Sequence, residues 1–358
     1  MYIYITLIFI FGWILYPIIL KKSNRRIANL FFLGILFPVC SFAMGFRDVS
    51  VGIDTQSYKQ MFDEYNLLSW HAIFVNSIDS ERADLGFKSF MKICSEIYPN
   101  YYFFQIIFSL IYVFLNLKLI FKYTDNVVLV SAIFLGGGLY MQSFNIARQM
   151  LAVIIGGYAI SSILNKKLLC ATFYILLAYL FHSSAIILFI IIILYPLRKY
   201  TFFLKIAPFL FLISIFLLGT SILNIVTMIF GEKYISYILN DYSRPNSGIL
   251  LKIMWLINFA IAMYTLYSKH IKEFILKYLS LISCISIACF IVGLYINFAD
   301  RMGLYFIPSF LFLYDKISLS IKNKKIQYVY NNGMTAFFIT FFTYWCFVND
   351  AIYYKTIL

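Results

Sequence analysis

Two polar side chains interrupt apolar sequence in the middle of this chain. Arg148 precedes an apolar stretch that ends at Asn165-Lys166-Lys167, and His182 follows the first half of the next apolar stretch. A cation or an imidazole at membrane depth is costly, which makes each a candidate for function. If the two stretches form consecutive antiparallel helices, both groups reach the same side of the bilayer. There a guanidinium could bind an anion and an imidazole could move a proton.

The elements that must position these groups are membrane-spanning helices. The chain is 63% hydrophobic, and apolar runs of span length recur from end to end. We expect an all-α, polytopic membrane protein with a single transmembrane domain over residues 1–358. About twelve spans are predicted, at 2–20, 27–45, 101–121, 127–143, 146–164, two halves of 168–197, 201–219, 249–268, 274–297, 302–314 and 333–349.

The run at 168–197 is flanked by basic clusters on both sides, so it should cross the membrane twice. Each half is then about 14 residues, or roughly 21 Å as helix, against ~30 Å of hydrocarbon. The turn at His182-Ser183-Ser184 should lie below the outer surface, in a wet cavity or packed in protein. A single long tilted helix is the alternative.

The net charge of +14 sits in short clusters between spans, where it sets topology and does not indicate nucleic-acid binding. The clusters place both termini outside. Two outer loops follow, at 46–100 and at 220–248, and the first carries more acidic than basic residues. Short amphipathic helices are expected around 58–65 and 86–97 in that loop. The first apolar segment has its basic cluster behind it and reads as a retained span, not as a cleaved signal peptide.

Arginine is unevenly distributed across this topology. The cytoplasmic clusters are mostly lysine, whereas five arginines are placed outside or at the outer membrane edge: Arg47, Arg82, Arg148, Arg244 and Arg301. Topology needs only positive charge, and guanidinium is the better bidentate partner for phosphate oxygens. The pattern favours a lipid phosphate or diphosphate of the outer leaflet as ligand.

Five segments together resemble the Wzy-like, EpsG-type family of bacterial O-antigen and exopolysaccharide polymerases. They are Phe46-Arg47 with residues 51–58 (VGIDTQSY), residues 84–87 (DLGF), 145–152 (NIARQMLA), 178–185 (AYLFHSSA) and 300–305 (DRMGLY). In the second segment Asp84 stands where the family usually has glutamate. No single motif is specific, but the order, spacing and predicted sidedness of the five agree.

The resemblance implies a Wzy/ligase-like GT-C-type architecture and a glycosyltransferase of the inner (cytoplasmic) membrane with its active site facing the periplasm or outside. It implies transfer of a growing glycan from undecaprenyl diphosphate to the next lipid-linked repeat unit, with a chain-length regulator protein as a further partner. No nucleotide sugar, cofactor or metal is expected, in keeping with a sequence that shows no acidic metal cluster or glycine-rich phosphate loop. Direct displacement would invert the anomeric configuration.

Three arginines are assigned to the diphosphate. Arg148 is the leading candidate for a clamp that stabilises charge on the leaving group, against a snorkelling or structurally paired arginine. Arg301 is assigned to substrate binding, although neighbouring Asp300 could be its partner or Arg301 could simply mark a membrane edge. Arg47 is assigned likewise, although it could be an interfacial arginine at the end of a span.

The acceptor side rests on four residues. His182 would accept the proton of, or orient, the attacking hydroxyl, against a core histidine bonded across helices. Asp54 is the competing base, or a turn-capping aspartate before Thr55. Tyr58 and Tyr305 would stack on sugars or bond phosphate, or else anchor the protein at the interface.

Two other functions stay open at this point. An O-antigen ligase uses the same donor with a different acceptor, and the motif around Asp54 favours the polymerase. A transporter or flippase of lipid-linked oligosaccharides should show broken helices in corresponding halves, or buried acidic residues that couple to ions. The sequence shows no convincing internal repeat and no carboxylate in mid-span.

Overall fold

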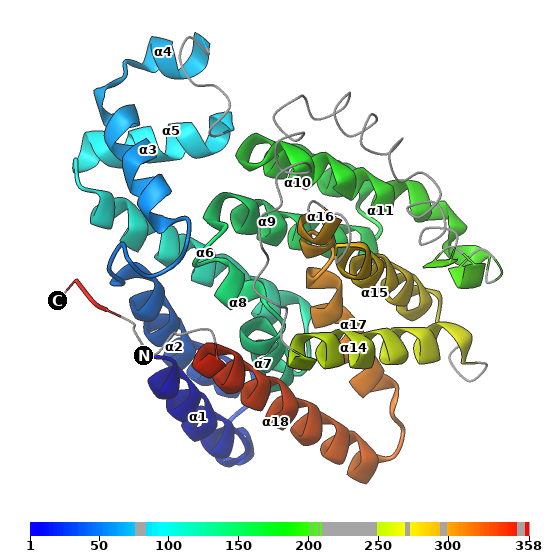
Figure 1. The fold of residues 1–358 in the computed structure, drawn as a ribbon. Coiled ribbons are helices and arrows are strands. Elements are labelled where there is room, and N and C mark those ends of the chain that lie inside the picture. The colour runs from blue at the N-terminus through cyan, green and yellow to red at the C-terminus, as the bar shows by residue number, and fades with distance from the viewer. Residues whose placement is uncertain are drawn as a thin grey trace. The chain divides into compact units, whose positions relative to one another are not determined.

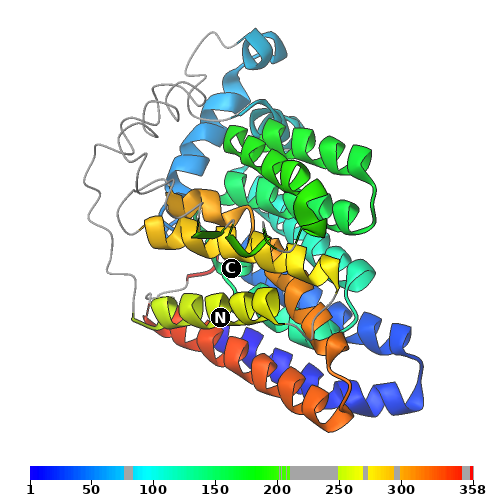
Figure 2. The same ribbon diagram turned by 90° about the vertical axis from the view of Figure 1, so that its right-hand side faces the viewer.

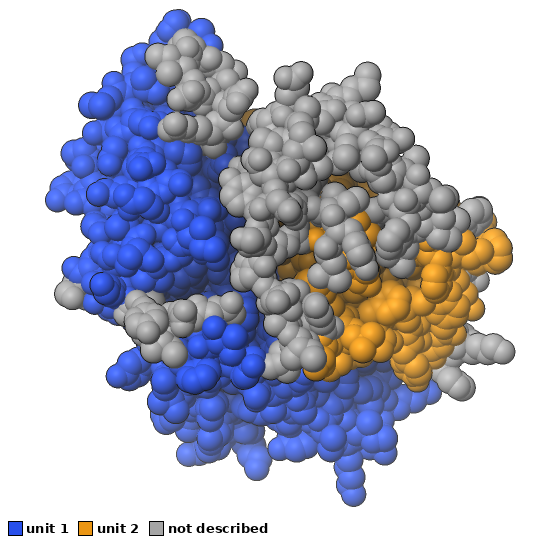
Figure 3. All heavy atoms as spheres, viewed as in Figure 1, with its two compact units in different colours: residues 1–154, 317–358 blue, residues 155–316 orange. Residues whose placement is uncertain are grey.

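The structure is a computed structural model that describes residues 1–75, 84–200, 249–268, 273–293, 299–348 and 355–357, with a few residues between 202 and 209. Two compact units can be distinguished, residues 1–154 with 317–358 (unit 1) and residues 155–316 (unit 2), which are coloured separately in Figure 3. A single transmembrane domain over the whole chain stays a prediction.

Helices are the regular secondary structure of the described residues, which otherwise form turns, loops and an isolated antiparallel bridge between Arg47 and Thr356. The helices, labelled in Figure 1, are α1 (Tyr2–Lys22), α2 (Arg25–Gly45), α3 (Thr55–Leu67), α4 (Trp70–Val75), α5 (Leu85–Ile97), α6 (Tyr101–Tyr123), α7 (Val127–Gly136), α8 (Leu139–Gln142), α9 (Ala147–Leu164), α10 (Leu168–Phe181), η1 (Ser183–Leu188), α11 (Phe189–Leu194), η2 (Pro196–Lys199), α14 (Ile249–Tyr267), α15 (Phe274–Val292), α16 (Ala299–Leu304), α17 (Pro308–Ser320) and α18 (Lys324–Val348).

Among the described residues, five helices are long and apolar enough to cross a membrane: α1, α2, α6, α9 and α15. Shorter apolar helices are α7, α10, the η1–α11 segment and most of α14. The prediction of a helical membrane protein is confirmed, and the count of twelve spans stays a prediction. The predicted loop at 220–248, Arg82, Arg244 and most of the predicted span at 201–219 lie outside the described residues.

Unit 1 is built by close packing of apolar helices. Within it, α2 packs on α1 and α6, and α18 lies alongside α7 and α1, as Figures 1 and 2 both show. Small residues permit these contacts, as is usual between membrane helices. A Cβ at Gly45 would lie 2.5 Å from Ser109 Oγ, and a Cβ at Gly136 would lie 2.1 Å from the Phe338 carbonyl oxygen. Close backbone approach therefore requires glycine at both positions.

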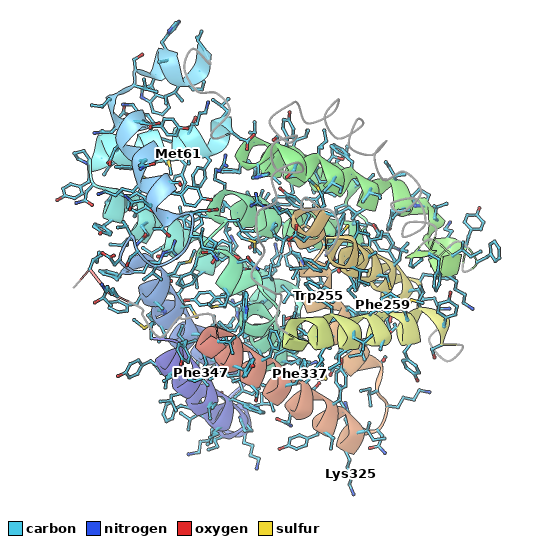
Figure 4. The ribbon with its side chains drawn as sticks, in the orientation of Figure 1. Met61, Trp255, Phe259, Lys325, Phe337 and Phe347 are labelled. Atoms are coloured by element: carbon cyan, nitrogen blue, oxygen red, sulfur yellow. The ribbon has the colours of Figure 1, made fainter. Side chains whose placement is uncertain are left out.

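The polar contacts at one end of unit 1 join the predicted cytoplasmic segments. Arg25 forms a 3.3 Å ion pair with Asp125, and Asn126 donates a 3.0 Å hydrogen bond to Ser318. Lys325, in the first turn of α18, points away from the other helices at the bottom of Figure 4. Lysine and arginine gather at this end, which the positive-inside rule would place in the cytoplasm.

The first loop carries three helices at the opposite end of unit 1, at the top of Figure 1. There α3 packs on α5 and α6, and α4 packs on α5. Both amphipathic helices predicted in this loop are confirmed, since α3 covers 58–65 and α5 covers 86–97. Their apolar faces bury Met61 and Phe62 on α3 and Phe87 and Met91 on α5.

In unit 2, α15 packs on both α14 and α16. Trp255 of α14 stacks on Phe290 of α15 with ring centroids 5.1 Å apart; Figure 4 labels this tryptophan. Gly303 of α16 lies so close to α15 that a Cβ there would meet the Ser286 carbonyl oxygen at 2.8 Å. This contact fixes the segment that leads to Tyr305.

Of two predictions for the helices of unit 2, the structure confirms one and contradicts the other. The break at His182 is confirmed, because α10 ends at Phe181 and His182 has extended backbone angles (φ −157°, ψ 115°). The predicted span at 302–314 is wrong as a single helix: α16 ends at Leu304 and α17 begins at Pro308. Proline disfavours helical geometry in the residue before it, which explains why the helix restarts there.

Candidate functional site

The first predicted motif is seated on the turn before α9. Gly52 has φ +96°, and a Cβ there would lie 2.5 Å from the Phe144 carbonyl oxygen and 2.7 Å from Thr55 Oγ1. The Ile53 N–H donates a 2.9 Å hydrogen bond to Asn145 Oδ1. We call these contacts of residues 52, 53 and 55 with Phe144 and Asn145 the loop seat. It joins two motifs about 90 residues apart in sequence, and only glycine fits at position 52.

Arg47 reaches the same turn from the end of α2. Its Nη2 donates to the Phe144 carbonyl oxygen at 3.1 Å and lies 3.5 Å from Thr55 Oγ1. The guanidinium carbon is 4.6 Å from the centre of the Phe144 ring, a cation–π distance. The residue is 2% exposed.

The loop seat brings three predicted site residues together in unit 1. Asp54 occupies the N-cap position of α3, and Tyr58 lies one turn further along. Arg148, at the start of α9, donates hydrogen bonds to the Tyr58 hydroxyl, and Asp54 is near enough to act on the same phenol electrostatically. Burial raises the pKa of Tyr58 and the Arg148 cation partly offsets this, so the phenol is neutral at pH 7. The cluster offers a cation, a hydroxyl and a carboxylate.

A second cluster lies in unit 2. Ser184 Oγ is 2.7 Å from His182 Nδ1 and 2.9 Å from the Tyr305 hydroxyl, which is itself 3.1 Å from Nδ1. Ser184 and Tyr305 are both 0% exposed. The extended backbone of His182, at the break after α10, allows the ring to meet these hydroxyls. Two buried hydroxyl groups therefore hold one nitrogen of the imidazole.

The contacts of His182 Nδ1 with Ser184 and Tyr305 determine which ring nitrogen carries the proton, and so whether His182 can act as a base. If Nδ1 accepts a hydrogen bond from a hydroxyl group, neutral His182 carries its proton on Nε2 and can only donate a hydrogen bond from that nitrogen. If Nδ1 carries the proton and donates it to Ser184 or Tyr305, Nε2 is free to accept one. A role as base requires the second arrangement.

Arg301 lies on α16, four residues before Tyr305. The Asp300 carboxylate accepts a 2.8 Å hydrogen bond from the Arg301 backbone N–H. The structure thus groups Arg47, Asp54, Tyr58 and Arg148 in unit 1 and His182 with Tyr305 in unit 2. That both groups serve one substrate, and the role of each residue in them, stay predictions.

Sequence reasoning assigned no role to three residues that organise these clusters. Asn145 and Phe144 form the receiving side of the loop seat, and Ser184 bridges His182 and Tyr305. Both Asn145 and Ser184 lie inside the motifs that carried the resemblance, and that proximity was the available signal. Phe144 acts largely through its backbone oxygen, which no side-chain pattern reveals.

Within the residues that the structure describes, no group of three or more His, Cys, Asp or Glu side chains is placed to hold a metal ion. That the reaction needs no metal or cofactor stays a prediction.

The apolar helices of span length and the helical loop seated on one of them define a polytopic helical membrane protein with polar clusters at helix ends. Residues 29–357 match the model of the EpsG family, and the chain belongs to that family. The predicted resemblance is confirmed over nearly the whole chain. No curated protein and no solved structure matches the chain. Family membership indicates a polysaccharide-polymerase-like membrane protein and is consistent with a glycosyltransferase-type polymerase.

Proposed function

We propose that this protein polymerises oligosaccharide repeat units carried on undecaprenyl diphosphate at the outer face of the cytoplasmic membrane, building an O-antigen, capsule or exopolysaccharide. The observation that carries the proposal is the loop seat, which places Asp54 and Tyr58 beside Arg148 in a chain of the EpsG family. Arg148, bonded to the neutral Tyr58 hydroxyl at the end of a span, is suited to bind an anionic headgroup. Fixed protein dipoles already replace part of the water around this cation.

The reaction is substitution at an anomeric carbon. An acceptor sugar oxygen forms a bond to that carbon, and the bond from the carbon to the diphosphate oxygen breaks with its electron pair leaving on the lipid diphosphate. Diphosphate leaves readily, so charge stabilisation and alignment of the acceptor contribute more than a strong acid would. Arg148 is assigned to the diphosphate, and Arg301 is a second cation for it. Direct displacement inverts the anomeric centre.

The acceptor proton has two candidate destinations. His182 receives it if its tautomer leaves Nε2 basic, and Asp54 is the alternative. The two differ in pH dependence, because the pKa of an unperturbed imidazole is about 6.5 and that of an unperturbed aspartate is about 3.9. A limb of the pH–rate profile near neutrality that disappears in His182→Gln would assign the proton to His182, and one retained in that variant would favour Asp54.

The direct test is incubation of purified protein with a defined undecaprenyl-diphosphate repeat unit, followed by sizing of the products. We expect a ladder of oligomers that differ by one repeat. Arg148→Ala should abolish the ladder, whereas Arg26→Ala, an exposed arginine at the opposite end of unit 1, should leave it unchanged. A protein that only moves the lipid-linked unit across vesicles, or that joins it only to a different acceptor, would refute the proposal.

A further inference from the structure

Arg47 is more deeply buried than we expect of a residue that binds a substrate. It is 2% exposed and among the largest fully buried side chains of the described residues. Its guanidinium is directed at the Phe144 carbonyl oxygen, Thr55 Oγ1 and the Phe144 ring. A phosphate that bonded Nη2 would have to displace the contacts that hold the loop seat.

The backbone of Arg47 is held as firmly as its side chain. Gln105 on α6, itself 2% exposed, donates from Nε2 to the carbonyl oxygens of Gly45 at 2.9 Å and Arg47 at 2.8 Å. These bonds fix the backbone as the chain leaves α2, at the residue from which the guanidinium side chain begins. Amide donors directed at backbone oxygens make a rigid support in a buried site.

The C-terminal segment holds the other edge of the same backbone. Thr356 forms the antiparallel bridge with Arg47, made by hydrogen bonds from Asp48 N–H to the Lys355 oxygen (2.8 Å) and from Ile357 N–H to the Phe46 oxygen (3.0 Å). Figure 1 shows this segment next to the end of α2. Hydrogen bonds from Ser50 lower the pKa of Asp48, with smaller contributions from others including Lys355.

We propose that Arg47 is a positioning residue, the centre of a lock in which Gln105 and the C-terminal segment 355–357 fix its backbone while its guanidinium holds the loop seat. The lock joins five segments of unit 1: the end of α2, the start of α3, α6, the turn before α9 and residues 355–357. Its role in catalysis rests on the proposed function, because the lock acts by holding Asp54 and Tyr58 beside Arg148. Arg47 itself does not bind the diphosphate.

The first experiment measures backbone hydrogen exchange by mass spectrometry over residues 46–58, with full-length protein in nanodiscs and no substrate. Arg47→Met removes the donors and the charge but keeps an apolar chain of similar length. We expect exchange in this segment to become at least about tenfold faster, because the amides of Asp48 and Ile53 lose protection as the lock loosens. Arg26→Met, at the opposite end of unit 1, should leave the segment unchanged.

A lysine substitution at position 47 distinguishes a positioning residue from a residue that binds the diphosphate. Arg47→Lys keeps the positive charge, but an ammonium group cannot donate to the Phe144 carbonyl oxygen and cover the Phe144 ring at the same time. The positioning role should therefore be lost when the guanidinium is replaced. We expect Arg47→Lys to exchange as fast as Arg47→Met. Both variants should lower kcat of polymerisation by about tenfold or more with little change in KM for the lipid donor, because the loop must reseat before reaction.

The C-terminal segment offers a matched pair of variants. Ile357→Pro removes the N–H that bonds the Phe46 oxygen, whereas Ile357→Val keeps that N–H. We expect Ile357→Pro to raise exchange at 46–48 and lower kcat well beyond any effect of Ile357→Val.

Unchanged exchange in Arg47→Met together with a tenfold or larger rise in donor KM would overturn the proposal and make Arg47 a ligand. Wild-type exchange in Ile357→Pro would overturn the part assigned to the C-terminal segment. The exchange measurements contain no substrate, so they test the lock even if the purified protein makes no polymer.

Discussion

Gly52→Ala is the most direct test of the loop seat. The φ of +96° costs a non-glycine residue about 1–3 kcal/mol. The added Cβ would lie 2.5 Å from the Phe144 carbonyl oxygen, so the two backbones must shift apart, which disturbs the hydrogen bond that this oxygen accepts from Arg47. Losing this hydrogen bond to a charged donor costs about a further 1.5–3 kcal/mol. The sum is at least about 2.5 kcal/mol, which raises the ratio of unseated to seated loop by roughly 60-fold.

The assay combines polymer length with backbone exchange. In cells that lack the native gene, Gly52→Ala should produce single or very short repeats, and the Ile53 amide of the purified variant should exchange faster. Gly34→Ala is the matched control, because a Cβ at Gly34 meets nothing within 4 Å and the residue is exposed on α2. Normal polymer and wild-type exchange in Gly52→Ala would refute the argument that this motif must rest on the turn before α9.

Three further predictions concern the clusters themselves. Arg148→Lys keeps a charge but loses the planar fork, so purified protein should polymerise about 10- to 100-fold more slowly with a higher donor KM; an unchanged KM would argue against a clamp. Ser184→Ala removes one of the hydroxyls at Nδ1 of His182, so we expect a shifted pH–rate profile and about tenfold lower kcat; a purely structural serine would leave the profile in place. Burial raises the pKa of the Cys94 thiol from 9.0 to about 11. In a variant with no other cysteine it should therefore react with a membrane-impermeant maleimide about 100-fold more slowly than an exposed cysteine at pH 7, and rapid labelling would show that α5 is not packed on α3 and α6.

The sequence predicted correctly those helices and helix breaks that depend on the local pattern of apolar and charged residues. The spacing of apolar residues located α3 and α5 in the first loop, because an amphipathic helix records its buried face in its own sequence. The break at His182 followed from counting residues between two basic clusters. The span at 302–314 failed because hydrophobicity alone does not register a helix restart at Pro308.

What sequence could not predict depends on contacts between distant segments. Phe144 receives Arg47 through a backbone oxygen, and nothing in its side chain indicates that. The Lys355–Ile357 segment pairs with residues about 300 positions earlier through backbone groups alone. Backbone hydrogen bonds carry no residue-type signature, so their partners emerge only from the fold.

The arginines predicted on the outer side were grouped because guanidinium suits phosphate, and the structure gives Arg47 and Arg148 different environments. Arg148 shares its cluster with a phenol and a carboxylate and is part-exposed, whereas Arg47 is 2% exposed and bonded to protein oxygens. The planar fork that makes arginine a good phosphate ligand also lets it bond a carbonyl oxygen while its face covers an aromatic ring. Arginine therefore has two properties that lysine lacks, and the proposals for Arg148 and Arg47 each use one of them. Only exposure distinguishes them, because a ligand must be reached by its substrate and a positioning residue need not be.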